Sequence, residues 1–157
     1  MKATGLGIDS DLLTDHWLTI DGHHLFHRQG IHTEGKRPVV LLHGIGVSGR
    51  YMVPLAHRLA PRYDVRVPDL AGFGRSYKPR PVLGVEDLAD ALEAWMEACD
   101  LSRAVVLGNS FGCQVAAAHA HAHPGRVDHI VLQAPTMDPR TRAWPGLIAH
   151  WLADIWR

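Results

Sequence analysis

The period of hydrophobic and polar positions changes along the chain and separates an early hairpin from later buried strands. Two runs that mix apolar and polar residues, 16–20 and 24–28, flank Asp21 and Gly22. An Asp-Gly pair between such runs predicts a β-hairpin. The next run, P-V-V-L-L at 38–42, is continuously apolar. Such a run is typical of a strand that is buried on both faces of a sheet.

Beyond residue 42, segments with helical spacing of apolar residues alternate with short apolar runs. The pattern predicts helices at 52–60, 88–99 and 111–123, and strands at 64–67, 104–107 and 129–132. Pro124 and Gly125 mark the end of the third helix. This alternation predicts an α/β fold whose sheet is mainly parallel and is preceded by an antiparallel hairpin. Another apolar helical stripe runs through 144–155.

Composition narrows the function classes. Sixteen basic residues balance sixteen acidic ones, which argues against a nucleic-acid partner. No run approaches the roughly 18 apolar residues of a membrane span, and the first ten residues lack the apolar centre of a signal peptide. We therefore expect a cytoplasmic protein without a membrane partner. Cys99 and Cys113 form no C-x-x-C pair, so the sequence indicates neither a metal site nor a redox motif.

The run G-N-S-F-G at 108–112 carries the strongest chemical signal. It matches G-x-S-x-G and lies between a predicted strand and a predicted helix, which is the context of a nucleophile elbow. Gly108 and Gly112 avoid side-chain clashes in such a tight turn. Ser110 is therefore predicted to be a nucleophile at the start of a helix, where free amides favour negative charge.

A second glycine-rich loop, H-G-I-G-V-S-G at 43–49, follows the strand at 38–42. Acyl transfer requires preorganised donors for a tetrahedral oxyanion. The amide after the nucleophile, that of Phe111, is one such donor, and an earlier loop supplies the second. The start of this loop, His43 and Gly44, predicts that the Ile45 amide fills that role.

The same loop also permits a dinucleotide-binding interpretation. Gly44, Gly46 and Gly49 read G-x-G-x-x-G, and Asp69 follows about twenty residues later. This interpretation explains neither the elbow at Ser110 nor the stretch D-L-A-G-F-G-R-S at 69–76. Pro68 also disturbs the strand end where a ribose-binding acid would lie. A nucleotide-binding oxidoreductase is therefore the third choice of function.

Taken in order, the 43–44 loop, the stretch 67–76 and the elbow at 108–112 resemble the α/β-hydrolase superfamily. The elbow and the stretch A-P-T-M-D-P at 134–139 resemble its lidded esterases and C–C-bond hydrolases. The resemblance implies that residues 1–138 are the N-terminal part of the hydrolase core and that 139–157 begin a lid helix. It also implies a chain truncated before the last strands of the sheet.

The resemblance implies a serine hydrolase that acts on a carboxylic ester or related carbonyl through an acyl-enzyme at Ser110. No residue aligns with the family's catalytic histidine, so none is assigned in this chain. Asp138 is at a place where some relatives carry the acid, although a turn position before Pro139 also explains it. Weak or absent activity of the chain alone is expected, and a non-catalytic protein that binds a ligand or a partner chain is the alternative.

The expected partner is a small-molecule substrate, with no cofactor or metal. The predicted strand at 129–132 would be a bare sheet edge, and the stripe at 144–155 has no obvious partner in the sequence. Together they predict a homo-oligomer.

Overall fold

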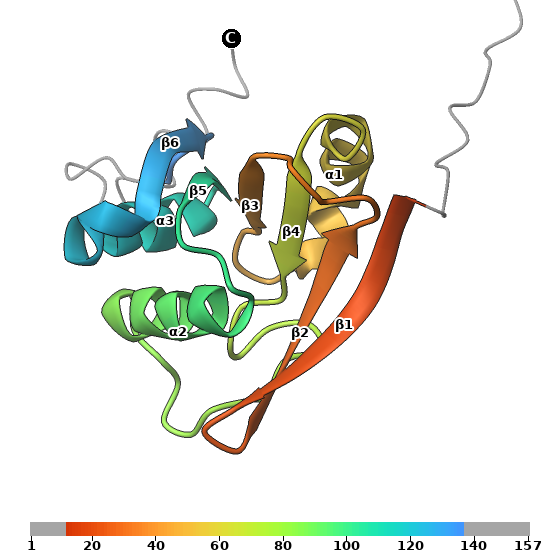
Figure 1. Cartoon of the computed structure of the whole chain (residues 1–157). Coiled ribbons are helices and arrows are strands. Elements are labelled where there is room, and N and C mark those ends of the chain that lie inside the picture. The colour runs from red at the N-terminus through yellow and green to blue at the C-terminus, as the bar shows by residue number, and fades with distance from the viewer. Residues whose placement is uncertain (1–11, 137–157) are drawn as a thin grey trace, which may run out of the picture.

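The computed structural model describes residues 12–136, which build one mixed six-stranded sheet in the order β1-β2-β4-β3-β5-β6. The strands are β1 (Leu13–Ile20), β2 (His23–Gly30), β3 (Pro38–Leu42), β4 (Asp64–Pro68), β5 (Ala104–Asn109) and β6 (Val127–Gln133) (Figure 1). Strand β2 is antiparallel to β1 and β4, whereas β4, β3, β5 and β6 are parallel. The predicted α/β class is confirmed.

The hairpin turn has the conformation that its residues favour. Asp21 and Gly22 have φ values of 48° and 78°, and Ile20 pairs with His23 across the turn. Two successive residues with positive φ characterise the type I′ turn, whose twist matches that of the strands it joins. The Asp-Gly pair therefore sets the register of the whole β1–β2 ribbon.

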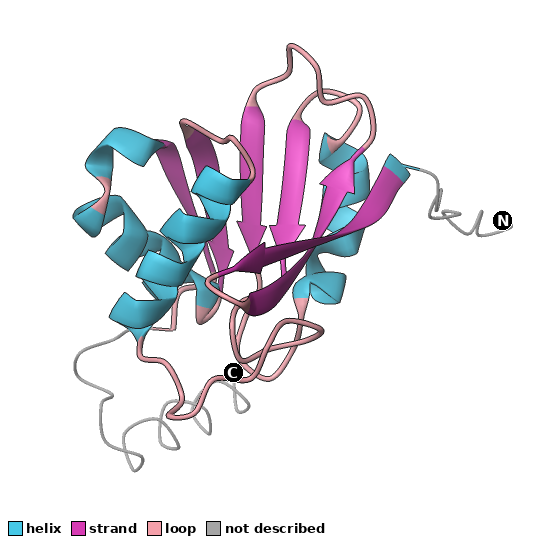
Figure 2. Cartoon of the chain, turned by 60° about the horizontal axis from the view of Figure 1, so that its bottom comes forward, coloured by secondary structure: helices cyan, strands magenta, loops and turns pink. Residues whose placement is uncertain are grey.

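Helices cover both faces of the sheet (Figure 2). Helix α1 (Val53–Leu59), which follows the short 3-10 turn η2 (Gly49–Met52), packs on one face. Helices α2 (Val85–Ala98) and α3 (Gly112–Ala122) pack on the other, and the 3-10 turn η3 (Pro124–Arg126) leads from α3 to β6. None of the helices in residues 12–136 is long and apolar enough to cross a membrane. The stripe at 144–155 and the expected lid at 139–157 lie outside the described residues.

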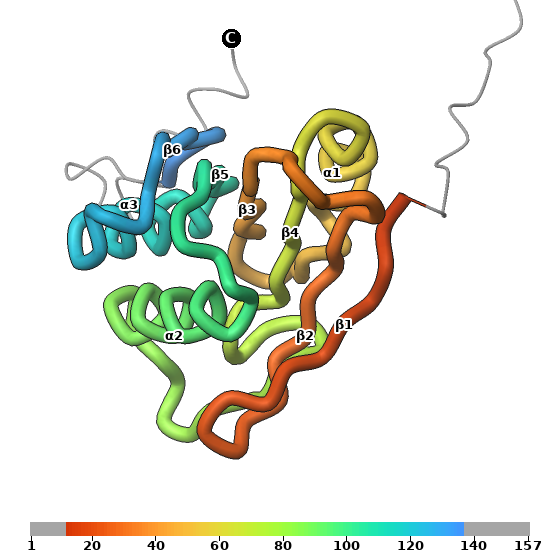
Figure 3. Tube along the Cα trace, in the orientation of Figure 1, coloured from red at the N-terminus to blue at the C-terminus, as the bar shows by residue number. Residues whose placement is uncertain are grey.

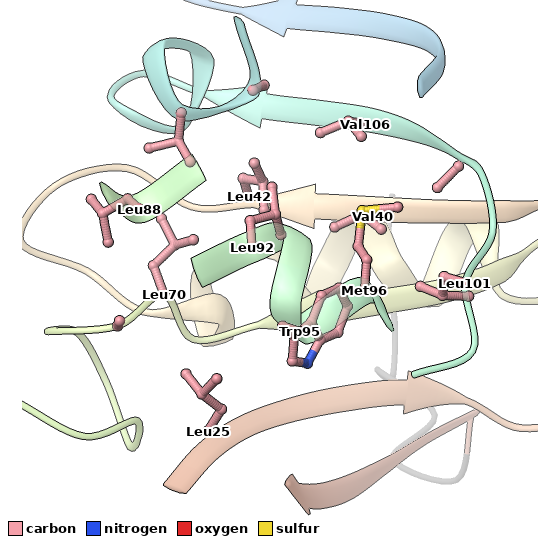
Figure 4. Packing of buried hydrophobic residues seen from close by; sticks show 14 residues of the cluster. Leu25, Val40, Leu42, Leu70, Leu88, Leu92, Trp95, Met96, Leu101 and Val106 are labelled. Carbon is pink, nitrogen blue, oxygen red and sulfur yellow. The ribbon is translucent and has the colours of Figure 1, made fainter. Parts of the chain in front are cut away.

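Strand β3 shows why its sequence is apolar throughout. Val39 and Leu41 pack into the cluster under α1, whereas Val40 and Leu42 pack into the opposite cluster. Figure 4 shows Leu42 beside Leu92 and Val40 beside Met96, two side chains of α2 in the same cluster. Because successive residues of a strand face opposite sides, a strand between two helical layers needs apolar residues at every position.

The chain reverses direction across the sheet at β3. It leaves β3 through α1 to reach β4 on one side, then crosses through α2 to β5 on the other side, as the tube trace shows (Figure 3). The loops after β3, β4 and β5 therefore meet at the carboxyl ends of these parallel strands, at the point where the strand order switches. Open α/β sheets bind ligands in the crevice at such a switch point.

Two histidines are buried within the layers. His27 on β2 is 3% exposed and accepts a hydrogen bond from Trp95 Nε1 at 3.4 Å. Burial, together with the nearby charges of His16 and Arg66, lowers the pKa of His27 from 6.5 to about 4. His119 on α3 is fully buried, and burial lowers its pKa although Glu93 acts in the opposite direction. Both histidines are therefore neutral in the folded chain near pH 7.

We expect the fold to lose stability as the pH falls from about 6.5 to about 4. The unfolded chain binds a proton at His27 in this range whereas the folded chain does not, so acid favours unfolding. A pKa lowered from 6.5 to about 4 corresponds to about 3 kcal/mol for this one group. Urea unfolding across the window should show a flatter pH dependence for His27→Gln than for wild type. The exposed-site control His121→Gln should keep the wild-type slope, and an unchanged slope in His27→Gln would contradict the prediction.

Strand β6 forms one edge of the described sheet and is exposed along most of its length. Ile130, Val131 and Leu132 are 39%, 42% and 46% exposed, so apolar side chains are accessible on both faces of the strand. An exposed apolar edge strand offers unpaired backbone groups to another chain. The homo-oligomer through this edge stays a prediction.

We expect the chain to self-associate through β6. Val131→Lys should weaken association at least about tenfold, because a lysine on an edge strand opposes pairing. Sedimentation velocity over a concentration series measures this effect. Val47→Lys is the matched control, because Val47 is an equally exposed valine in the loop after β3. A monomer at all concentrations, or equal effects of the two substitutions, would rule out this contact.

Candidate active site

Ser110 lies in a sharp turn between β5 and α3. Its φ of 53° places a non-glycine residue in the left-handed region, which costs free energy unless neighbouring contacts hold it. Here the Ser110 amide donates to the Gln133 carbonyl at 3.0 Å, and the Ser110 carbonyl accepts from the Cys113 amide at 3.0 Å. These two bonds fix the serine backbone to β6 and to the first turn of α3.

Glycines make this turn possible because backbones approach very closely. A Cβ at Gly108 would lie 2.3 Å from the Gly112 carbonyl oxygen, and one at Gly112 would lie 2.6 Å from the Leu42 carbonyl oxygen. A Cβ at Gly44 would lie 3.2 Å from the Ser110 Cβ. The three glycines predicted from the motifs therefore bring the ends of β3 and β5 together with the start of α3.

His43 is buried behind the loop that follows β3. Its Nε2 accepts a hydrogen bond from the Leu70 amide at 3.1 Å, so the ring proton is on Nδ1, which donates to the Gly44 carbonyl at 2.8 Å. Burial lowers the pKa of His43, which keeps the ring neutral. With both nitrogens engaged, His43 is not available as a base for Ser110.

The bond from His43 orients the neighbouring amide. The Gly44 carbonyl and the Ile45 N–H belong to one trans peptide plane and point in opposite directions, so holding the carbonyl also fixes the direction of the N–H. Within residues 12–136, neither the Ile45 amide nor the Phe111 amide donates to a backbone carbonyl. Both predicted oxyanion donors are therefore available to a ligand.

The buried carboxylate of Asp69 joins two loops of the site. It is 1% exposed, and its two oxygens accept the Gly49 and Arg75 amides, each at 2.7 Å. A Cβ at Gly74 would lie 2.0 Å from Asp69 Oδ2, which explains the glycine at that position. Asp69 therefore connects the loop after β3 to the loop after β4.

A cleft of about 650 Å³ opens beside the elbow. The side chains of Ile45 and Phe111, the two proposed donors, form one wall, and the other walls come from 71–73, 78–85 and Leu88. Most of the lining is apolar, and the volume lies within the range of small-molecule sites, roughly 300–1,000 Å³.

Comparisons with known proteins identify the family of this chain. A family model described as the alpha/beta hydrolase fold matches residues 37–157. The chain belongs to this family. A membrane phospholipase A structure superposes with a TM-score of 0.74 at 30% sequence identity, covering 77% of this chain and 39% of the phospholipase.

The names of two sequence relatives state an enzymatic activity. The human 1-acylglycerol-3-phosphate O-acyltransferase ABHD5 is 35% identical over 104 residues, which are 64% of this chain and 30% of that protein. The bovine (Lyso)-N-acylphosphatidylethanolamine lipase is 31% identical over 117 residues, which are 72% of this chain and 34% of the lipase. The matched part of this chain therefore spans about a third of these α/β-hydrolase relatives.

The geometry argues against the dinucleotide interpretation of the loop at 44–49. The Asp69 carboxylate, which would hold a ribose, is occupied by two backbone amides of the chain itself. Gly44 faces Ser110, and Gly49 packs against Asp69 and the end of β4. These glycines thus serve close packing in an α/β-hydrolase rather than the approach of a pyrophosphate.

The described residues contain a nucleophile turn without an assigned base. No hydrogen bond joins Ser110 to a histidine in residues 12–136, and no cluster of metal ligands occurs in that part of the chain. Asp138, the candidate acid, lies outside the described residues.

The structure also contains a polar cluster around the buried His119 that the sequence did not suggest. Glu93 on α2 lies 2.9 Å from His119 Nε2 and 2.6 Å from Arg126 Nε. Its carboxylate thus links α2, α3 and the turn before β6. The spacing of the histidines on α3 gave no sign of this role, because the partners come from distant segments.

We expect Gly112→Ala to destabilise the fold by at least about 3 kcal/mol, because the new Cβ would overlap rigid backbone carbonyls. Urea unfolding monitored by tryptophan fluorescence measures the loss. Gly125→Ala is the control, since nothing lies within 4 Å of its Cβ position, and it should be neutral or slightly stabilising. Equal stabilities of the two variants would refute the close-packed elbow.

Proposed function

We propose that the chain carries the nucleophile and oxyanion half of a serine hydrolase that acts on carboxylic esters or related carbonyls. The observation that carries the proposal is Ser110 at a φ of 53° in the strand–turn–helix elbow. This strained backbone aims the serine at the edge where the loops after β3 and β4 meet. Family membership and the lipase and phospholipase relatives support the same reaction class.

In the proposed reaction, a base accepts the Ser110 proton while the serine oxygen attacks the carbonyl carbon of the ester. The oxyanion accepts hydrogen bonds from the Ile45 and Phe111 amides. Collapse of the tetrahedral intermediate expels the alcohol, which takes up the proton, and leaves an acyl-serine. Water then attacks the acyl-serine, releases the acid and restores Ser110. No cofactor or metal takes part.

The geometry assigns a positioning role to His43. Its neutral ring donates a hydrogen bond to the Gly44 carbonyl. This bond also fixes the orientation of the peptide group that contains the Ile45 amide. The Leu70 amide fixes the ring tautomer. The general base and the acid are assigned to no residue in 12–136, and the activity of the chain alone is therefore expected to be weak. Loss of the histidine of a serine-protease triad costs on the order of 10⁶ in turnover.

A second candidate function is a non-catalytic α/β-hydrolase-like protein that binds a ligand or a partner chain. The observation in its favour is that no described histidine is hydrogen-bonded to Ser110. In this case the elbow and the cleft would keep their shape without an activated serine.

Covalent labelling by a fluorophosphonate distinguishes the two functions. We expect slow labelling of the chain, which is lost in Ser110→Ala, because the reagent reacts with a nucleophilic serine beside an oxyanion hole and no base is assigned in residues 12–136. Ser102→Ala, at an exposed serine of the loop before β5, should label like wild type. Mass spectrometry should place the adduct on Ser110. If folded wild-type chain remains unlabelled, the binding function is favoured and the catalytic proposal fails.

A further inference from the structure

The cleft beside the elbow has an apolar interior with a charge bias. Its lining includes two cations, Lys78 and Arg80, and no carboxylate. Within residues 12–136, neither cation forms an ion pair with an acid. The acids nearest in sequence are Glu86 and Asp87, in the first turn of α2. Asp87 accepts a hydrogen bond from the Gly84 amide, and Glu86 Oε2 lies 3.8 Å from the Cβ position of Gly84 without lining the cleft.

The side chains of Lys78 and Arg80 differ in how far hydrogen bonds within the chain restrict them. Lys78 Nζ donates to the carbonyls of Phe73, Gly74 and Ser76, so it closes the loop after β4 and its position is fixed. Arg80 is exposed and has no hydrogen-bond acceptor among the described residues. A planar guanidinium with free N–H groups matches the oxygens of a phosphate or carboxylate.

The apolar part of the cleft begins at the reaction centre. Ile45 and Phe111 line it, and within residues 12–136 neither of their amides donates to a backbone carbonyl. An acyl group attached to Ser110 would therefore extend directly into this cleft, along Leu83 and Leu88. Burial of a methylene chain there is favourable by the hydrophobic effect, whereas a polar chain would lose its hydration.

From this arrangement we infer that the site accepts an anionic amphiphile: an aliphatic acyl chain lies along the apolar wall, and a phosphate or carboxylate group pairs with Arg80. The orientation of the acyl group rests on the proposed function. Binding of the amphiphile, however, requires no reaction at Ser110 and can be measured separately.

The experiment compares binding of dodecyl phosphate and dodecyltrimethylammonium to the full chain by calorimetry, below the concentrations at which either forms micelles. The phosphate should bind at least about tenfold more tightly, as expected for charge-assisted hydrogen bonds to a cation. Octyl phosphate should bind more weakly, by up to about fourfold for each missing methylene that the cleft would bury. Equal affinity for the two head groups would overturn the proposal.

Variants locate the head-group contact. Arg80→Gln should weaken dodecyl phosphate binding about tenfold and leave binding of the ammonium compound unchanged or stronger. Arg58→Gln removes an exposed arginine of α1 outside the cleft and should bind like wild type. If the two variants weaken binding equally, the phosphate is held by general surface charge and the proposal fails.

Two further measurements separate this inference from the proposed function. Inorganic phosphate alone should bind far more weakly than dodecyl phosphate, and comparable affinity would indicate a simple anion site instead. Ser110→Ala should bind dodecyl phosphate like wild type. If the chain binds dodecyl phosphate but is not labelled by the fluorophosphonate, the amphiphile site is supported and the hydrolase proposal fails. If the chain is labelled but its binding of dodecyl phosphate does not depend on Arg80, the hydrolase proposal is supported and the amphiphile site fails.

Discussion

The close approach of three backbone segments around Gly112 is the constraint on which the site depends. The absent side chain of Gly112 leaves room for the carbonyls at the end of β3, and that of Gly108 leaves room for the first turn of α3. Only with these contacts can β5 turn into α3 at Ser110, beside the loop that follows β3. The apolar layers on both sides of the sheet hold the strands at this spacing.

Polar groups buried beneath the site then fix the loops that the glycines bring together. Asp69 binds one amide from each of two loops, and His43 binds a carbonyl of one loop and an amide of the other. Both oxygens of Asp69 and both ring nitrogens of His43 thus have a partner, and each bond also positions a segment of the site. Order in these loops comes from a few hydrogen bonds to side chains rather than from helix or strand pairing.

The sequence was sufficient for the elements and for the elbow, because both are encoded locally. The Asp-Gly turn, the uninterrupted apolar run of β3 and the G-x-S-x-G run between a strand and a helix are confirmed as structural predictions. Asp69 was considered only as a possible ribose-binding acid, and the Glu93–His119–Arg126 cluster was missed. Each role includes at least one partner twenty or more residues away, Gly49 for Asp69 and His119 for Glu93, which becomes a neighbour only when the sheet and its crossovers are formed.

The two hydrogen bonds that Asp69 accepts separate the residues around the cleft into two groups, which differ in how readily they could be substituted. Residues 70–76 are tied through this carboxylate to the loop that carries Ile45, so a substitution there would disturb that loop together with the wall of the cleft. The residues that line the same cleft outside that attachment are Pro79, Arg80, Val82 and Leu83. The shape of the cleft could therefore diverge most readily at these four positions, where a substitution leaves the two hydrogen bonds of Asp69 intact.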